Sequence, residues 1–163
     1  MRNYGRTLAL LLPACFLLAA CGSHDQTMYK GVTYPPTNQV QAAFQASQVP
    51  SSCLVFAQAL MVTPAGFSGG DIDQAVVKEA KARGANMVLI GRSRRSKEGD
   101  ALTFHYYGPE KAYPISNWLG WQYGFEEWEQ QGKWVDFGYN QWNNNTVRYD
   151  YPLVMHVAFL RCQ

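Results

Sequence analysis

The chain has 163 residues, a length that suits one domain. Hydrophobic residues make up 47% of it and aromatic residues 14%, and this composition excludes a chain that is disordered throughout. There are 14 Lys and Arg against 12 Asp and Glu. If Arg2 and Arg6 leave with a leader, the balance becomes 12 against 12, a formal charge of zero. Because phosphate binding needs a net basic field, this balance argues against nucleic acid as a partner.

The first 20 residues have the arrangement of a secretory signal peptide. Arg2 and Arg6 form the positive start, an apolar run covers 8–20, and two alanines supply the small residues before a cleavage point. This apolar run is shorter than the about 20 residues that a membrane-spanning helix needs. We therefore expect a leader that is removed.

The segment Leu18-Ala19-Ala20-Cys21 resembles the lipobox of bacterial lipoproteins. In that family the Cys thiol is coupled to diacylglycerol, the leader is cut off before the Cys, and the new amino group is acylated. The resemblance implies a membrane anchor through acyl chains on Cys21, and several such chains anchor a protein stably. It also implies the outer membrane of a Gram-negative cell, because Gly22 and not Asp follows the Cys. The alternative is an ordinary signal peptide with a Cys near the cut by chance.

The other cysteines predict one disulfide. Cys15 leaves with the leader and Cys21 is taken by lipid, so that Cys53 and Cys162 remain as a pair in an oxidising compartment. A reactive or metal-binding pair is the alternative, but no C-x-x-C spacing supports it. We expect no metal and no cofactor.

The mature chain divides into a lipidated N-terminus with a tether, 21–37, and one domain, 38–163. The tether is polar and contains Pro35 and Pro36. Periodicity and β-branched content in the domain predict strands over 38–45, 53–62, 86–91, 101–107 and 153–162.

One main helix is predicted over 71–83. Asp71 is the expected N-cap, with Gln74 completing a capping box, and Gly84 follows the helix as its C-terminal stop. The apolar positions that fall on one helical face are Ile72, Ala75, Val76 and Ala80.

The order of these elements predicts an α+β fold with a small mixed sheet of about four or five strands. A strand, a helix and a strand within about 40 residues indicate a crossover with parallel strands. The segment 153–162 is apolar on both faces and is expected in the sheet interior. Cys53 opens one strand and Cys162 closes another, so a disulfide is reasonable if these strands are antiparallel neighbours.

The segment 92–100 carries four cations within six residues. One interpretation is a site for an anionic surface. The other, which we favour at this point, is a strand end followed by a solvated turn beside Glu98 and Asp100.

An aromatic-rich insertion, about 108–151, precedes the last strand. The stretch 104–151 holds 15 of the 23 aromatic residues, interleaved with Gly and Asn, and a short helix is plausible around 125–132. Three interpretations stay open: a second small core, a protein interface, or a glycan or membrane surface. On the view that the insertion is peripheral, replacing 113–148 by a short linker leaves a folded core. The candidate binding surface consists of Trp118, Trp121, Trp128, Trp134 and Trp142.

Catalytic motifs are absent from the sequence: there is no G-x-S-x-G, no H-E-x-x-H and no Gly-rich phosphate loop. His156 lies in the middle of the most apolar segment, which favours a core residue over a base. A carboxylate pair for glycan cleavage is conceivable among Glu126, Glu127, Glu129 and Asp136, but a solvated helix face is the favoured interpretation. We therefore expect a protein that is not an enzyme.

Part of the domain, 34–92 and 153–163, resembles small Gram-negative envelope lipoproteins such as the Rcs stress sensor RcsF. The Tyr34-Pro35-Pro36-Thr37 start and the Ala-rich helix that runs through Gly84-Ala85-Asn86 into an apolar strand carry the resemblance. It implies a similar disulfide-linked α+β core. The expected function is that of a lipid-anchored envelope lipoprotein acting as a non-enzymatic binding or structural component, facing the periplasm or the cell surface. The alternatives are an envelope-stress or assembly sensor that contacts another envelope protein, and a protein that binds or cleaves peptidoglycan or another glycan.

Overall fold

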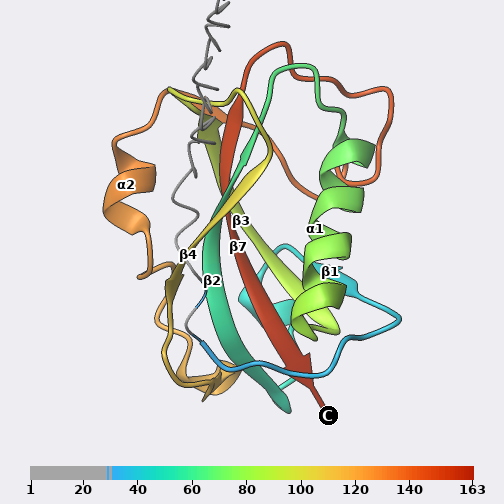
Figure 1. The fold of residues 1–163 in the computed structure, drawn as a ribbon, viewed down its shortest axis with the longest axis vertical. Coiled ribbons are helices and arrows are strands. Elements are labelled where there is room, and N and C mark those ends of the chain that lie inside the picture. Colours follow the sequence, from blue (N-terminus) through green and yellow to red (C-terminus); the bar gives the residue numbers. More distant parts are fainter. Residues whose placement is uncertain (1–28, 30) are drawn as a thin grey trace, which may run out of the picture.

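A mixed β-sheet lies between one long helix and a layer of aromatic loops (Figure 1). The computed structural model describes Tyr29 and residues 31–163; the predicted leader, Cys21 and most of the predicted tether lie outside the described residues. The elements in chain order are β1 (Gln41–Ala43), η1 (Ala46–Gln48), β2 (Cys53–Thr63), α1 (Gly69–Arg83), β3 (Met87–Arg95), β4 (Thr103–Gly108), β5 (Tyr113–Pro114), η2 (Ile115–Asn117), α2 (Phe125–Glu129), β6 (Trp134–Val135) and β7 (Leu153–Cys162).

The sheet confirms the predicted α+β class. Five strands lie in the order β1-β3-β7-β2-β4, and the short strands β5 and β6 pair with β2 and β3. Strand β7 is antiparallel to both β2 and β3, so those two strands run parallel to each other with β7 between them. The predicted interior position of the last strand is therefore confirmed.

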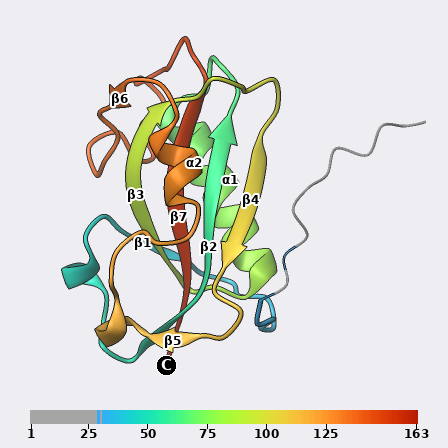
Figure 2. The ribbon, with the colours of Figure 1, turned by 90° about the vertical axis from the view of Figure 1, so that its left-hand side faces the viewer.

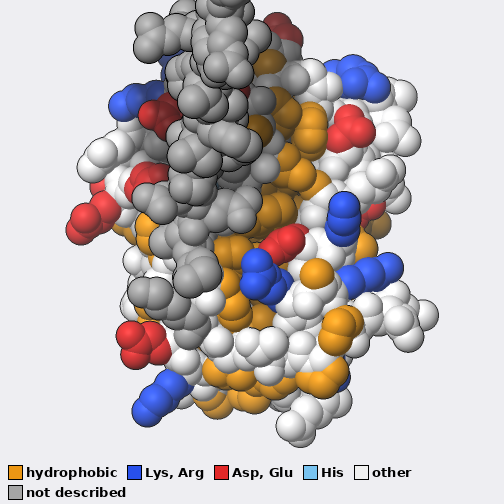
Figure 3. Space-filling model, viewed as in Figure 1, with side chains coloured by type: hydrophobic (Ala, Val, Ile, Leu, Met, Phe, Trp, Pro, Cys, Tyr) orange, Lys and Arg blue, Asp and Glu red, His pale blue; other side chains and the backbone are white. Residues whose placement is uncertain are grey.

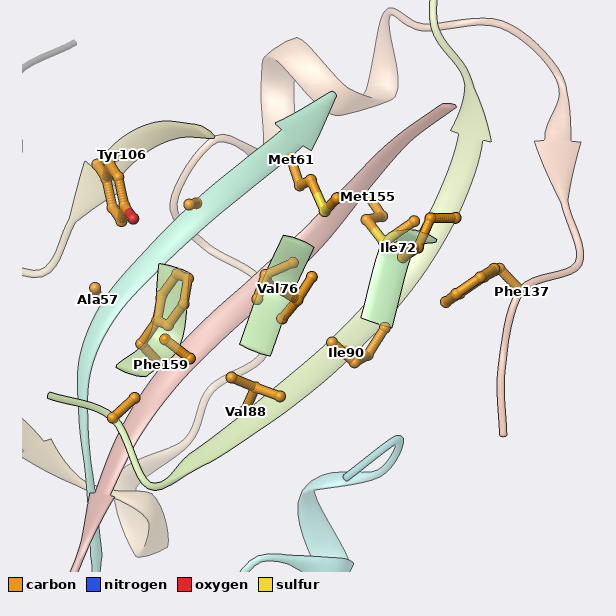
Figure 4. Packing of buried hydrophobic residues seen from close by; sticks show 14 of the residues in the cluster. Ala57, Met61, Ile72, Val76, Val88, Ile90, Tyr106, Phe137, Met155 and Phe159 are labelled. Carbon is orange, nitrogen blue, oxygen red and sulfur yellow. The ribbon is translucent and has the colours of Figure 1, made fainter. Parts of the chain in front are cut away.

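Side chains of β7 alternate between two buried faces. Leu153, Met155, Val157 and Phe159 lie in the core beneath α1, seen in part in Figure 4. The residues between them, from Val154 to Leu160, face the opposite layer, which the aromatic insertion supplies. All eight residues from Leu153 to Leu160 are buried, as the apolar pattern on both faces predicts.

Helix α1 buries its apolar stripe against the sheet. Ile72, Val76 and Ala80 are buried, and Ala75 lies partly buried beside them, in agreement with the predicted helical face. Gly84 ends the helix in the left-handed conformation, with φ of 81°.

The predicted N-cap of this helix is three residues late, because the N-cap is Ser68 and not Asp71, and the helix begins at Gly69. The Ser68 hydroxyl accepts a hydrogen bond from the Asp71 amide at 3.1 Å, and the Asp71 carboxylate accepts one from the Ser68 amide at 2.8 Å. The Ser68 hydroxyl also donates to the Asp71 carboxylate at 2.7 Å, and this hydrogen bond, together with that from the Ser68 amide, holds the pKa of Asp71 below its usual range. The capping box thus runs from Ser68 to Asp71, and Gln74 takes no part in it.

Cys53 and Cys162 form the predicted disulfide. They stand directly opposite each other in the antiparallel pair of β2 and β7. Their separation of 109 residues in the sequence means that the bond closes nearly the whole domain. Chain-entropy reasoning for a loop of about this length gives a stabilisation of up to ~4.7 kcal/mol.

The predicted tether is partly folded onto the domain. Tyr34 lies edge-on to Phe56 with ring centroids 5.0 Å apart, and the Thr37 amide donates to the Lys81 carbonyl at 3.2 Å. Residues 31–37 therefore belong to the domain, because their aromatic and backbone groups cover the end of α1. The strand predicted over 38–45 is also shorter, since only Gln41–Ala43 pairs, in parallel, with β3.

The aromatic insertion forms the second layer on the sheet. In Figure 2 the short helix α2 lies in front of the sheet and α1 lies behind it. Ile115 and Trp128 are buried against the front face, whereas Phe137 and Tyr149 join the core beneath α1. The insertion thus contributes buried residues to both faces of the sheet, which supports the interpretation as core for these four side chains.

The last part of the insertion also covers the start of α1. The Gly69 amide donates to the Val147 carbonyl at 3.0 Å, and the Tyr149 amide donates to Phe67 at 3.0 Å. A Cβ atom at Gly69 would collide with the backbone carbonyl of Gln141. Glycine at this position therefore allows the Asn-rich loop to lie directly on the helix N-terminus.

These contacts reverse the expectation that the insertion can be removed. Replacing 113–148 by a Gly/Ser linker should abolish the cooperative urea transition, because it deletes three large buried side chains, Ile115, Trp128 and Phe137. The burial of each of these side chains contributes roughly 1.5–3 kcal/mol to the free energy of unfolding. A domain has a free energy of unfolding of only about 5–15 kcal/mol, so it cannot lose all three.

Two single variants provide a matched comparison within the same segment. Trp128→Ala should lose about 3–5 kcal/mol in urea melts, whereas Trp134→Ala should lose about 1 kcal/mol or less, because Trp128 is 3% exposed and Trp134 is 53% exposed.

A deletion variant that unfolds cooperatively with a wild-type midpoint would show that the insertion is peripheral after all.

Candidate binding groove

The outer edge of β3 is incompletely paired. Strand β1 pairs with Met87–Leu89, and β6 pairs with Ser93 and Arg94. Between these two partners, residues 90–92 have no strand beside them on this edge within the described part of the chain. The insertion and the segment after β1 lie around this gap, and two adjoining pockets form there.

We call these two pockets together the edge groove. One has a volume of about 390 Å³ and the other about 330 Å³, both within the range of roughly 300–1,000 Å³ that ligand pockets show. They adjoin because Arg92 and Phe137 line both. The first is lined further by Ser93, Trp134, Val135 and Asp136, and the second by 44–46, 89–91, Trp118, Trp121 and Gly138.

One wall of the edge groove is a pair of indoles. Trp118 and Trp121 meet edge to face with ring centroids 5.0 Å apart. Trp121 in turn stacks on His156, also at 5.0 Å, and can do so because a Cβ atom at Gly91 would lie 2.6 Å from the Trp121 ring. The absence of a side chain at Gly91 therefore lets this wall lie flat on the sheet.

The opposite wall is a stack of guanidinium and indole groups. The Arg94 guanidinium lies 4.6 Å from the ring centroids of both Trp128 and Trp134, and Arg92 lies 5.3 Å from Trp134. Arg94 also donates to the Gly132 carbonyl at 3.1 Å. Cation–π contacts of this kind fix the exposed Trp134 ring at the groove without burying it.

The structure agrees with a strand end followed by a solvated turn over 92–100. Strand β3 continues to Arg95, four residues beyond the predicted strand, and an exposed loop with a bend at Lys97 follows. Arg92 and Arg94 rest on tryptophans and Arg95 on Tyr151, so these three cations belong to the folded structure. Elsewhere on the surface, cations and carboxylates are interspersed, as on the face in Figure 3.

Two polar groups at this edge of β3 lack a polar partner among the described residues: Arg92, which packs on Trp134, and Ser93, whose side chain faces the core beneath α1 with that of its strand neighbour Met155. In the part of the chain that the structure describes, Arg83–Glu79 is the single ion pair, so Arg92 has no carboxylate partner there. The Ser93 hydroxyl is 1% exposed and has no hydrogen-bond partner among these residues. A buried hydroxyl without a partner is costly to the folded state.

The five predicted tryptophans do not form one surface. Trp118, Trp121 and Trp134 line the edge groove, whereas Trp128 is buried behind it and its indole nitrogen donates to the Arg92 carbonyl at 3.1 Å. Trp142 packs with Phe44 and Phe137 beside the core under α1. The prediction that Trp128 belongs to the binding surface is therefore wrong, because its ring is buried against β7.

The candidate carboxylates are divided between two places. Glu126, Glu127 and Glu129 are exposed on α2, where Glu127 accepts a hydrogen bond from the Tyr107 hydroxyl. Asp136 lines the edge groove instead. Glu127 also lines a third pocket of about 670 Å³, together with His105 and the polar loop 96–101, and the His105 ring pairs with the Thr103 hydroxyl at 3.0 Å.

A scan against protein-family models found none that matches this chain, and searches of curated proteins and of solved structures found no match either. Within residues 31–163 and Tyr29, no group of three or more His, Cys, Asp or Glu side chains could hold a metal ion. Neither of the described helices is long and apolar enough to cross a membrane.

Sequence reasoning missed most of the groove. Phe44, Gly91, Ser93 and Phe137 were not singled out, because they are far apart in the sequence and meet only at the edge of β3. The tryptophans were found through their local enrichment. The cluster of cations was a usable signal for a longer strand. Arg92 and Arg94 alternate with Ser93 directly after the apolar residues, and this alternation extends the strand.

His156 generates a prediction on stability. It is 1% exposed and packs against the Trp121 and Trp128 rings, and within the described part of the chain neither of its ring nitrogens has a hydrogen-bond partner. Burial lowers its pKa to about 4 from an ordinary 6.5, so the folded protein holds it neutral. Below pH 6.5 the unfolded chain protonates this histidine more readily than the folded protein does. The free energy of unfolding should therefore fall by on the order of 3 kcal/mol as the pH is lowered from 6.5 to 4.

Urea melts of His156→Phe should lack this component of the pH dependence, because the variant keeps a ring and removes the titrating group. His105→Phe, the matched control at a half-buried histidine, should keep it. Equal slopes of stability against pH in the wild type and His156→Phe would contradict the assignment.

Proposed function

We propose that this protein is a lipid-anchored lipoprotein of the bacterial cell envelope that acts by binding another envelope component in the edge groove. The observation that carries the proposal is the groove itself: at an open sheet edge, Arg92 stands between two aromatic walls and has no ion-pair partner among the described residues. Apolar walls with a few converging polar groups are the usual build of a binding site. The lipobox pattern that ends at Cys21 supports the anchor and the outer membrane as its location.

The groove and the start of the described chain are at opposite edges of the sheet. The Tyr29 ring lies 5.0 Å from that of Tyr106 on β4, and the groove lies at β3, near the other end of the strand order. Cys21 precedes Tyr29 by 29 − 21 = 8 residues, which span at most about 28 Å. An anchor at Cys21 would therefore join the domain at its β4 edge, the edge away from the groove.

The chemistry of the groove favours binding over catalysis. Its charged groups are Arg92 and Asp136, and its hydroxyl is that of Ser93. Glycan cleavage by the usual route needs two carboxyl groups that flank the bond, and the lining supplies one. We therefore propose a non-enzymatic role.

The test combines lipid labelling with photocrosslinking in living cells. A photoreactive amino acid replaces the exposed Trp134, in chains with Cys21 and with Cys21→Ser. The Cys21 chain should incorporate labelled palmitate, fractionate with the outer membrane and give crosslinked adducts. The Cys21→Ser chain should incorporate no palmitate and remain an uncleaved precursor.

The control places the same photoreactive residue at Phe125, an exposed aromatic on α2 outside the groove. Adducts should depend on position 134 and be absent or much weaker from 125. Palmitate in the Cys21→Ser chain would refute the anchor, and equal adducts from both positions would refute the groove as the binding site.

A further inference from the structure

We propose that residues 118–131 form an acid-sensitive flap on the sheet, which opens when the buried imidazole of His156 takes up a proton. We call this segment the flap. The inference goes beyond the proposed binding function, because it concerns a wall of the groove and not the groove's ligand. It is carried by the way in which the flap is attached and by the group that lies beneath it.

The flap is attached to the sheet by backbone pairing at its two ends only. Strand β5 pairs with β2 before the flap, and β6 pairs with β3 after it. Among the described residues, the backbone groups of 118–131 bond to other backbone groups only within 115–131. In Figure 2 the flap, with α2, lies in front of the sheet. A segment held in this way can open locally while the strands stay paired.

Side chains hold the middle of the flap, and two of them rest on His156. The Trp121 ring stacks on the imidazole with centroids 5.0 Å apart and planes at 21°, and the Trp128 ring lies at 5.0 Å and 42°. Trp128 also packs against Leu60 and Val154. His156 is 1% exposed on the face of β7 that the flap covers, so water reaches its ring only if the flap moves.

The closed flap gives a protonated His156 no counter-charge. In the part of the chain that the structure describes, no carboxylate bonds to the imidazole, and its neighbours Leu60 and Gln58 on β2 are uncharged. The titratable and charged groups of the other elements on this side of the sheet are Arg92 and Arg94 on β3, His105 and Tyr107 on β4, and Tyr123, Glu126, Glu127 and Glu129 on the flap.

The cations lie closer to the imidazole's surroundings than the carboxylates do. The Arg94 guanidinium is 4.6 Å from the Trp128 ring centroid, and its Nε is itself buried without a partner among the described residues. The three glutamates are exposed on the outside of α2, where Glu127 accepts from the Tyr107 hydroxyl. A proton on His156 would therefore add a second buried cation under the flap.

Opening removes this penalty. Burial lowers the pKa of His156 to about 4 from an ordinary 6.5 in the closed form. Cation–π attraction to two indoles offsets only part of the cost of burial, because both N–H groups of the imidazolium lack acceptors. In the open form water accepts both hydrogen bonds and the ordinary pKa returns. The equilibrium constant for opening should therefore rise on the order of 50-fold from pH 7 to pH 4.5.

Opening also changes the edge groove. Trp118 and Trp121 belong to the flap and line the second pocket, so the open form loses that wall. Trp134 and Asp136 lie beyond the flap, in and after β6, and continue to line the first pocket. Acid thus alters one pocket of the groove and leaves the other in place.

The test is native-state hydrogen exchange on the full chain in detergent, at pH 7 and pH 4.5 and in low concentrations of urea. The readouts are the indole proton of Trp128, which bonds to the Arg92 carbonyl under the flap, and the amide of Val76 in α1, on the other face of the sheet. The protection factor compares each exchange rate with that of an unstructured chain at the same pH.

The Trp128 protection factor should fall about 50-fold at pH 4.5 and should hardly depend on urea, whereas that of Val76 should fall steeply with urea at both pH values. In His156→Phe the Trp128 protection factor should change less than about threefold between the two pH values. His105→Phe, the matched control, should keep the full decrease.

A second variant keeps the titrating group and removes part of its cover. In Trp121→Ala the NMR titration of the His156 ring should move from about 4 toward 6.5, because water reaches the imidazole more easily. This measurement also decides the matter if His156→Phe does not fold.

Three outcomes would overturn the inference. Exchange at the Trp128 indole that depends on urea as steeply as at Val76 would show that the flap opens only with the whole domain. A full acid-induced decrease in His156→Phe would assign the sensitivity to another group. An unchanged His156 titration in Trp121→Ala would show that this ring is not its cover.

Discussion

Strand β7 buries side chains on both of its faces, and the rest of the structure depends on covering both. Helix α1 covers one face with Ile72, Val76 and Ala80. The chain has no second long helix among the described residues, so the aromatic insertion covers the other face with Ile115, Trp118, Trp121 and Trp128. Large aromatic rings suit this task, because a few of them remove much apolar surface from water without a regular secondary structure.

The same requirement produces the groove. The insertion begins after β4 and returns to β7, and on the way it supplies β6 to the upper part of the β3 edge while β1 occupies the lower part. The gap between them leaves residues 90–92 open and exposes one side of rings whose other side is already in the core. Two rings of the groove are packed against the scaffold, since Trp121 stacks on His156 and Trp134 contacts the Arg94 guanidinium.

The local elements could be predicted from the sequence, and their assembly could not. The two-faced apolar pattern of 153–162 predicted the central strand, and the expected Cys53–Cys162 disulfide was consistent with the antiparallel neighbour that the structure shows. The start of α1 was missed because Gly69 and Gly70 are poor helix formers, and their role depends on the Asn-rich loop that lies against them. Composition alone treats Trp128 and Trp134 alike, and only the tertiary packing of Trp128 with Leu60 and Val154 makes one core and the other surface.

Hydrogen exchange at the five indole nitrogens tests most directly whether the insertion is core on one side and groove on the other. The Trp128 indole donates to the Arg92 carbonyl at 3.1 Å from a ring that is 3% exposed, so its proton should exchange only on opening of the domain. The indole proton of Trp134, on a ring that is 53% exposed, should exchange much faster than that of Trp128. A Trp128 proton that exchanges as fast as that of Trp134 in the folded full chain would contradict the account.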